Sequence, residues 1–263
     1  MTAGVGKKGR DFSNIFYPTA TIALALLGWE LMSRLGVAPA YALPPPREVL
    51  RVLVDDWSVL ASNAVSTTAV IMAGFSLSVV VGVALAVMIS SSRVFEKSVY
   101  PLLIGSQAVP KLALAPLFVV WFGFGLLPKV LMTFLIAVFP IVVSTVQGIA
   151  SVEPEVEFLA RSMGLGQYRT FRMIRLYRAL PSIFAGLKVA ITLAVVGAVV
   201  GEFVGSDRGL GTLLLRAIGV VNTPLLFAAL IVLTVLAVVL FALIELLERL
   251  AIPWHVSQRS RSA

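Results

Sequence analysis

Two charged side chains lie inside long apolar stretches of this sequence, where a charge needs a functional reason. Lys111 lies between Pro110 and Pro116, and Glu202 lies near the end of a later apolar stretch. A charge at the centre of a bilayer costs about 2.5–3.5 kcal/mol on insertion scales, so such residues commonly line a substrate or ion pathway. The sequence therefore predicts that both side chains face a central pathway, and that Lys111 attracts an anion there.

Both residues also have a structural explanation, which the sequence leaves open. The carboxylate of Glu202 would pair with Arg208 or Arg216 at the membrane boundary, and the Lys111 ammonium would extend to lipid headgroups. Two neutral side chains, which are weaker candidates for lining the same pathway, are Gln107 and Trp121. A lone glutamine in a span also serves to bond a neighbouring helix.

Several other kinds of chemistry are excluded by residues that the sequence lacks. It contains no cysteine and one histidine, His255, so it offers no thiolate or histidine metal site and no Ser-His-Asp triad. A phosphate-binding loop of the form G-x-x-x-x-G-K-[ST] is missing, so this chain should not hydrolyse ATP by itself. Glu202 and Lys111 are too isolated for the polar cluster of a membrane-embedded enzyme. We therefore expect a non-catalytic protein without a metal or a cofactor.

The composition places these residues in an all-α integral membrane protein. Of the 263 residues, 59% are hydrophobic and 13% are charged, whereas soluble domains average about 25% charged residues. The apolar stretches predict six spanning helices, at about 16–35, 64–90, 100–127, 129–150, 187–204 and 223–247. The third is interrupted by Pro101, Pro110, Pro116 and the pair Gly123 and Gly125. Such breaks are tolerated at membrane depth only where the backbone is covered by protein or faces a watery cavity.

The distribution of basic residues predicts the topology. With the N-terminus inside, about two thirds of the 21 Lys and Arg residues fall in the cytoplasmic segments, which also explains the net charge of +8 without nucleic acid. The first apolar stretch resembles a signal peptide, with Ala40-Tyr41-Ala42 as a cleavage pattern, but its length and the following spans favour a retained helix. The predicted organisation is a cytoplasmic tail at 1–15, one membrane domain at 16–250 and a second cytoplasmic tail at 251–263.

Shorter segments give local predictions. The pattern at 47–61 indicates an amphipathic helix at the membrane–water interface, and the alternative is that it forms the polar start of the next span. A basic turn is expected at 91–97, and a glycine-rich turn at 206–223. Thr223 is expected to cap the last span, with Pro224 at its first position.

The one long polar interval, 151–186, predicts two further helices. For the first, Ser151 is the expected N-cap, Pro154 lies in the first turn and Gly164 ends the helix. Helical spacing groups four of its residues on one apolar face, namely Val156, Leu159, Ala160 and Met163. The second helix pairs an apolar stripe with a basic one before Pro181; these stripes hold Tyr168, Phe171 and Ile174, and Arg169, Arg172, Arg175 and Arg178.

An amphipathic helix of this kind suits two roles. It could lie flat on anionic headgroups, or its apolar face could dock in the groove of a cytoplasmic partner. Docking is the favoured prediction, whereas nucleic-acid binding is not supported because no base-reading module is present.

This interval resembles the cytoplasmic coupling loop of ABC importer permeases. The resemblance rests on A160-R-S-M-G164 and L176-Y-R-A-L-P181-S-I-F-A-G186-L, and is strongest to the branch for sulfonates, taurine, nitrate, bicarbonate and thiamine-precursor pyrimidines. Ala160, Gly164, Ile174 and Leu176 match the loop pattern of that family, and Pro181 matches a second Leu-Pro of the branch. Phe158 and Leu159 replace the usual Glu-Ala, with Glu157 one place early, and Tyr177 replaces a usual proline. The stretch 107–125 also resembles this branch.

The resemblance, which covers about 40–250, implies a type I ABC importer permease with six transmembrane helices and a cytoplasmic coupling helix. Implied partners are two cytoplasmic ATPase subunits, a second permease copy, a periplasmic or lipid-anchored substrate-binding protein and membrane lipid. It implies the bacterial inner membrane, with both termini cytoplasmic. Residues expected to couple to the ATPase are Val156, Leu159, Ala160, Met163, Gly164, Leu165, Tyr168 and Arg169.

The expected substrate is a small organic or inorganic anion of the sulfonate, taurine, nitrate or carboxylate class. A thiamine-precursor pyrimidine, or another small nutrient, is the alternative within the same role. A self-sufficient secondary transporter is the alternative class, but it would normally show two related halves, and the sequence shows none.

Overall fold

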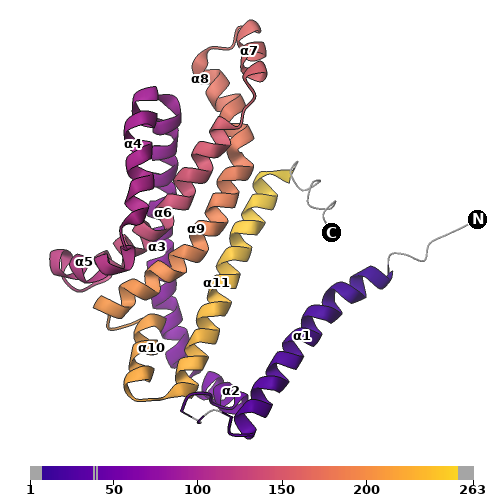
Figure 1. Ribbon diagram of the computed structural model, residues 1–263, viewed down its shortest axis with the longest axis vertical. Helices are drawn as coiled ribbons and strands as arrows, with labels where there is room; N and C mark the ends of the chain where they lie inside the picture. The colour runs from indigo at the N-terminus through magenta and orange to yellow at the C-terminus, as the bar shows by residue number, and fades with distance from the viewer. Residues whose placement is uncertain (1–7, 38, 40, 254–263) are drawn as a thin grey trace, which may run out of the picture. The chain divides into compact units, whose positions relative to one another are not determined.

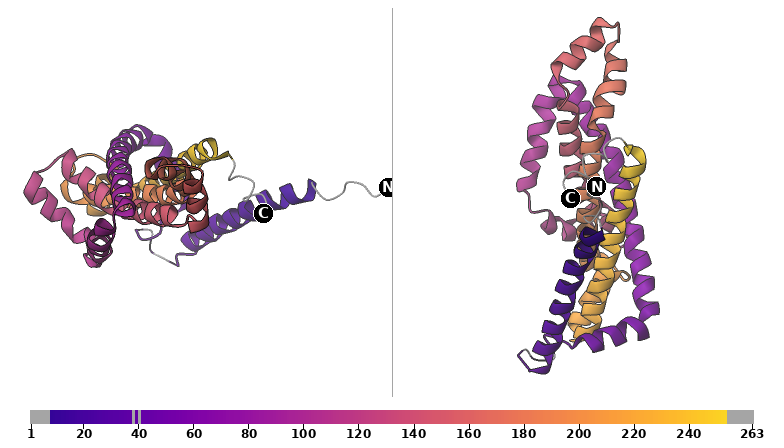
Figure 2. Two further views of the ribbon diagram at one scale, coloured as in Figure 1. Left: turned by 90° about the horizontal axis from the view of Figure 1, so that it is seen from above. Right: turned by 90° about the vertical axis from the view of Figure 1, so that its right-hand side faces the viewer.

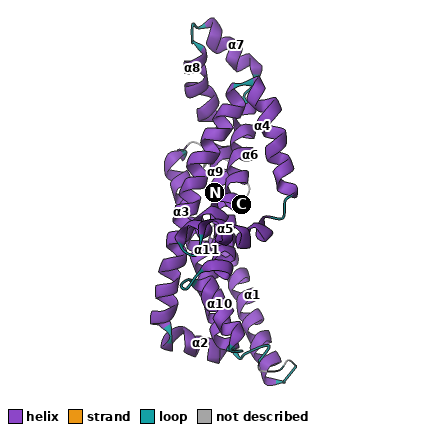
Figure 3. Cartoon of the chain, turned by 90° about the vertical axis from the view of Figure 1, so that its left-hand side faces the viewer, coloured by secondary structure: helices purple, strands orange, loops and turns teal. Residues whose placement is uncertain are grey.

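A computed structural model describes residues 8–37, 39 and 41–253. Within these residues the regular structure is entirely helical, as Figure 3 shows. They form two compact units, each with its own internal contacts. The first holds the described residues up to Leu60 together with Leu214–Ile231, and the second holds Ala61–Leu213 together with the described residues from Val232 onward.

The first unit contains α1 (Lys8–Arg34), α2 (Pro46–Asp55) and parts of α10 (Leu210–Gly219) and α11 (Thr223–Ala251). The indole of Trp29 donates to the Pro44 carbonyl at 3.0 Å, and its ring lies 5.4 Å from that of Phe227. The predicted cap of the last span is wrong: Asn222 Oδ1 accepts the Leu225 N–H at 3.2 Å, whereas the Thr223 hydroxyl donates to the Tyr41 carbonyl.

The helix predicted at 47–61 is two helices. α2 ends at Asp55 and α3 (Trp57–Ser91) begins two residues later. Asp56 closes α2 through its N–H to the Val52 carbonyl at 3.0 Å, and its φ of −99° and ψ of 19° interrupt the helical repeat. The interfacial segment is therefore α2 alone, and the residues from Trp57 belong to the following long helix.

The second unit is built around α6 (Leu126–Ala150) and α9 (Leu176–Gly205), which run side by side in Figure 1 and pack along much of their lengths. Small residues allow this close approach. A Cβ on Gly148 would lie 2.7 Å from the Cβ of Ser182, and one on Gly197 would lie 2.7 Å from the Cα of Thr133. α3 also approaches α6 closely at a glycine, because a Cβ on Gly82 would lie 3.0 Å from the side chain of Ile141 on α6.

Among the residues that the structure describes, four helices are long and apolar enough to cross a membrane: α3, α6, Gln167–Gly205 and α11. A fifth candidate is a pair of helical segments, Arg93–Ala108 and Lys111–Phe122, bent by 78°. The pair comprises α4 (Arg93–Gly105), η1 (Ser106–Ala108), η2 (Lys111–Ala113) and α5 (Leu114–Phe122). Of the predicted interruptions, the one at Pro110 is present, at Val109 and Pro110. Pro101 and Pro116 do not interrupt a helix, because they lie inside α4 and α5.

Three local predictions differ from the structure. The turn expected at 91–97 is reduced to Ser92, because α4 already begins at Arg93. Most of the turn expected at 206–223 is the short helix α10. Pro181 does not separate two helices, since it lies inside α9 and the helical run from Gln167 to Gly205 is continuous.

Candidate functional site: the polar segment between α6 and α9

A short helix, α7 (Pro154–Ser162), follows α6 and lies beyond the end of the α6–α9 pair (Figure 1 and the right-hand view of Figure 2). Pro154 occupies the first helical position, where its missing N–H costs nothing. The predicted cap by Ser151 is wrong, because its hydroxyl donates to the Gly148 carbonyl at 2.8 Å at the end of α6. Glu153 occupies the N-cap position without a side-chain bond, and two further acids, Glu155 and Glu157, lie in the first turn.

The end of α7 is a Schellman motif, which confirms the predicted role of Gly164 in ending the helix. Gly164 has φ +84°, and its N–H donates to the Arg161 carbonyl at 2.9 Å. The Leu165 N–H donates to the Ala160 carbonyl at 3.0 Å, the second bond of the motif. Because this left-handed conformation is costly for other residues, Gly164 fixes where the chain leaves the helix.

Much of the apolar surface of this segment faces outward. Phe158, Leu159 and Met163 on or just after α7, and Tyr168 on α8 (Gln167–Thr170), are each at least 61% exposed. Ala160 is buried and Val156 is half-buried. The apolar face predicted for this helix therefore has some residues in the interior of the protein and others on its surface. A group of large exposed apolar side chains on one small segment is typical of an interaction surface. Of the other predicted coupling residues, Leu165 is half-buried and Arg169 is exposed.

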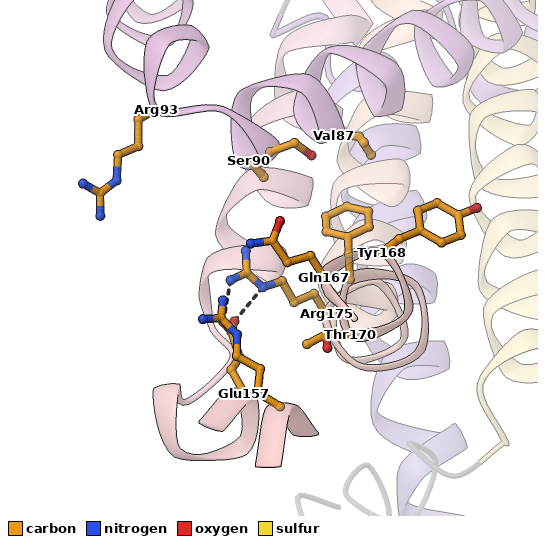
Figure 4. Close-up of a pocket in the computed structure, with 11 residues that line it drawn as sticks. Val87, Ser90, Arg93, Glu157, Gln167, Tyr168, Thr170 and Arg175 are labelled. Atoms are coloured by element: carbon orange, nitrogen blue, oxygen red, sulfur yellow. Dashed lines mark hydrogen bonds and ion pairs between the residues drawn. The ribbon is translucent and has the colours of Figure 1, made fainter. Parts of the chain in front are cut away.

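A bidentate ion pair fixes α7 to the next helical turn. Arg175 Nε lies 2.5 Å from Glu157 Oε1, and its Nη2 lies 2.6 Å from Oε2, as Figure 4 shows. Arg175 ends a π-helical turn, η3 (Phe171–Arg175), which connects α8 to α9. The hydrogen bond from Arg175 holds the pKa of the Glu157 carboxyl below its usual value. Fork-to-fork geometry of this kind sets orientation as well as attraction.

A cavity of about 660 Å³ lies between the end of α3 and this polar segment (Figure 4). Its lining brings together the Glu157–Arg175 pair, Gln167 and Tyr168 with Ser90 near the end of α3. Two more arginines, Arg93 and Arg161, also line it. The segment therefore faces α3 and α4 across a cavity with a mixed polar and apolar lining. Val87 of α3 and Phe171 also pack against one hydrophobic cluster.

The pathway candidates divide into two places. Gln107 on η1 and Lys111 on η2 flank the bend of the broken span, and Lys111 Nζ lies 5.5 Å from the centroid of the Phe139 ring. Trp121, at the other end of α5, is 62% exposed and its ring centroid lies 6.2 Å from that of Phe118.

Glu202 has a separate environment, in which the residue is 1% exposed. The Thr67 hydroxyl donates to Oε1 and the Gly211 N–H to Oε2, both at 2.8 Å. Thr67 Oγ1 in turn accepts the Leu210 N–H at 2.8 Å. The carboxylate thus joins α3, α9 and the start of α10 through neutral donors, and neither arginine suggested by the sequence is its partner.

The sequence assigned no role to two lysines, Lys129, which is buried, and Lys188, which is half-buried. Lys188 Nζ forms an ion pair with Glu248 Oε2 at 2.6 Å, and Lys129 Nζ donates to Ser206 Oγ at 2.9 Å. Both lie at the ends of apolar stretches, and only their partners in the fold distinguish them from lysines at headgroup level.

The helical architecture and the broken span can now be compared with known proteins. A family profile described as "binding-protein-dependent transport system inner membrane component" matches residues 78–252. The chain belongs to this family. This permease is therefore a subunit of an ABC importer and crosses the inner membrane with several apolar helices. That membership confirms the resemblance seen in the polar interval and decides against a secondary transporter.

Relatives of this permease are named for different substrates. It is 36% identical to the formylaminopyrimidine transport permease protein ThiX of Halalkalibacterium halodurans, over 92% of this chain and 96% of the relative. It is also 36% identical to the riboflavin transport system permease protein RibX of Chloroflexus aurantiacus, over 90% of this chain and 89% of the relative. The taurine transport system permease protein TauC of Escherichia coli is 28% identical, over 89% of this chain and 88% of the relative.

Proposed function

We propose that this permease forms half of a substrate pathway that works by alternating access, and that α7 is its coupling helix. A separate ATPase subunit would grip the exposed surface of α7 and α8 and hydrolyse the ATP. The observation that carries this proposal is the outward-facing set of Phe158, Leu159, Met163 and Tyr168 on a segment oriented by the Glu157–Arg175 pair. A helix with exposed apolar anchors fits the groove of a partner protein.

The proposed membrane arrangement has six spans, with both termini on the cytoplasmic side. The four long apolar helices and the bent pair account for five spans, and α1 would be the sixth. This arrangement places α7 and its neighbouring arginines inside the cell, as the positive-inside rule favours. A second permease copy would complete the pathway, and a periplasmic or lipid-anchored binding protein would deliver the substrate.

For the substrate, we favour a small heteroaromatic nutrient of the pyrimidine-precursor kind. The support is the higher identity to permeases named for formylaminopyrimidine and riboflavin, 36% in both cases, than to the taurine permease, 28%. A small anion is the second candidate, because Lys111 lies beside the bend of the broken span. Replacing Lys111 with Met tests its predicted place on the pathway, since unchanged uptake would remove it from there.

The coupling role is tested in nanodiscs that contain this permease, its ATPase and its binding protein. Leu159→Asp should abolish co-purification of the ATPase and ATP-driven uptake, because it puts a charge in the docking surface. Val94→Asp is the matched control, since Val94 is also exposed but lies on α4. Normal uptake by the Leu159 variant would show that the ATPase docks elsewhere. Calorimetry of the binding protein with pyrimidines, flavins, sulfonates and carboxylates would identify the substrate class.

A further inference from the structure

The π-helical turn η3 interrupts the α-helical run Gln167–Gly205 near its start. The Leu176 N–H donates to the Phe171 carbonyl, five residues earlier, where an α-helix would bond four residues back. Single π-helical turns inside α-helices are rare, occur frequently at functional sites and are one of the few causes of sharp bends in a helix. This one lies between the exposed segment of α7 and α8 and the long helix α9.

The side chains of the turn explain why it holds an extra residue. Phe171 and Leu176 both pack against one hydrophobic cluster, which includes Ile183 of α9. Residues five apart in an α-helix lie about 140° apart around its axis, so an α-helical turn would bring Arg172 onto the cluster in place of Phe171. The π-turn keeps Phe171 on the cluster and leaves Arg172 and Met173 exposed.

One side of the turn borders open space. Phe171 and Arg175, the first and last residues of η3, both line the cavity of about 660 Å³ described above. The facing wall of this cavity comes from the end of α3 and from Arg93 at the start of α4. A bend at η3 toward this wall would therefore displace solvent before it displaced packed side chains.

The ion pair between Glu157 and Arg175 connects α7 to α9 across the turn (Figure 4). Arg175 occupies the N-cap position of α9, so a displacement of α7 acts directly on the start of that helix. Because partly exposed ion pairs hold their partners only weakly, α7 can change its angle about the guanidinium group. The turn thus has both room to bend and a link that passes the motion on.

We propose that η3 is the joint at which α7 and α8 change their angle to α9 during transport. The ATPase moves α7, the chain bends at the π-turn toward the cavity, and the Glu157–Arg175 pair passes the displacement to the start of α9. This inference rests on the proposed role of α7 as the coupling helix. It adds that the run Gln167–Gly205 bends at one defined place and does not move as a single rod.

Deletion of Met173 removes the joint. Phe171 and Leu176 then lie four residues apart, so the turn becomes α-helical while both side chains stay on one face of the helix. In nanodiscs with the ATPase and the binding protein, this variant should bind the ATPase and hydrolyse ATP but lose at least tenfold in uptake. Met173→Ala is the matched control, because it removes the same exposed side chain, keeps the π-turn and should transport as the wild type does. Normal uptake by the deletion variant would overturn the proposal.

A distance measurement tests the bending directly. The chain has no cysteine, so spin labels can be attached specifically at Glu155→Cys on α7 and Val189→Cys on α9, both exposed positions. Variants with one label identify the distances between copies of the permease. The distance within one copy should differ between the nucleotide-free complex and the complex trapped with ATP and vanadate. An unchanged distance in the otherwise wild-type protein overturns the proposal, whether or not the deletion variant folds or assembles.

Failure of the joint and failure of the proposed function give different results. If α7 is not the coupling helix, Leu159→Asp keeps both ATPase binding and uptake. If α7 is the coupling helix but η3 is not a joint, Leu159→Asp loses both, while the deletion of Met173 leaves uptake normal or the label distance stays the same in both nucleotide states.

Discussion

The two ends of the helical run Gln167–Gly205 hold a carboxylate in opposite ways. At the first end, Arg175 binds Glu157 through a bidentate ion pair, and the two side chains remain 30% and 17% exposed. At the other end, Glu202 is 1% exposed and receives only neutral donors, from Thr67 and Gly211. The first arrangement is a partly solvated charged pair, and the second is a desolvated network without spare room.

This difference indicates where the structure can adjust. Partly exposed ion pairs stabilise by about 1 kcal/mol or less, so the α7 segment can change its angle at little cost. Each hydrogen-bond donor removed from a buried carboxylate costs about 1–3 kcal/mol of stability. The residues around Glu202 are therefore expected to move together. A displacement of α7 would thus be transmitted along the helical run to a rigid unit formed by α3, α9 and the start of α10.

The largest expected effect comes from filling the space beside Glu202. Gly209 has φ +133°, and a Cβ there would collide with the Glu202 carboxylate. Gly209→Ala should therefore destabilise the protein by about 2–4 kcal/mol and abolish uptake. Gly219→Ala is the control, because nothing lies within 4 Å of a Cβ at that position. Thermal unfolding in detergent measures both, and equal melting temperatures would contradict the rigid-block description.

A smaller effect is expected when the charge of Glu202 is removed but its size is kept. Glu202→Gln replaces one carboxylate oxygen with an NH2 group, which would face either the Thr67 hydroxyl or the Gly211 N–H. The Gly211 N–H cannot accept a hydrogen bond from this group. We expect a loss of about 1–3 kcal/mol in stability, with lower uptake per ATP hydrolysed. Thr67→Ser keeps the hydroxyl and should behave almost as the wild type. A Gln variant with normal stability and uptake would show that the network is dispensable.

Local chain geometry accounts for what the sequence could predict at each end. The left-handed conformation of Gly164 and the break at Pro110 follow from properties of single residues, and the structure contains both. The Glu157–Arg175 pair joins residues 18 positions apart, and the Thr67–Glu202 bond joins residues 135 positions apart. Such contacts depend on how helices pack, which no local pattern records.

The two wrong cap predictions have the same origin. Ser151 and Thr223 are good capping residues by type, but their hydroxyls donate to the carbonyls of Gly148 and Tyr41. A hydroxyl that can bond in several directions takes the acceptor that the surrounding structure offers. The coupling residues on α7 could be predicted because their periodicity is local, whereas the burial of Lys129 gave no local signal.

At the adjustable end, Gly164 is expected to matter for coupling more than for stability. Gly164→Val would disfavour the left-handed conformation and redirect the chain after α7, at a cost of about 1–2 kcal/mol. Uptake should fall at least tenfold while the ATPase either fails to assemble or hydrolyses ATP without transport. Gly166→Ala is the control, since Gly166 has φ −68° and nothing near its added Cβ. Wild-type uptake in the Val variant would mean that the cap geometry has no part in coupling.

The smallest expected effect is the pH dependence of the Glu157–Arg175 pair. The pair lowers the pKa of Glu157 below its ordinary value of 4.5. Its stabilisation is therefore complete above about pH 4.5 and is lost as the pH falls through the lower pKa of the folded protein. Glu157→Gln should be less stable than the wild type by about 0.5–1 kcal/mol at pH 7, and this difference should shrink in acid. Hydrogen exchange of the amides of α7 at a series of pH values measures it. A difference that stays constant down to acid pH would show that the charge of Glu157 does not hold α7, and that this end of the helical run is fixed by packing, as the Glu202 end is.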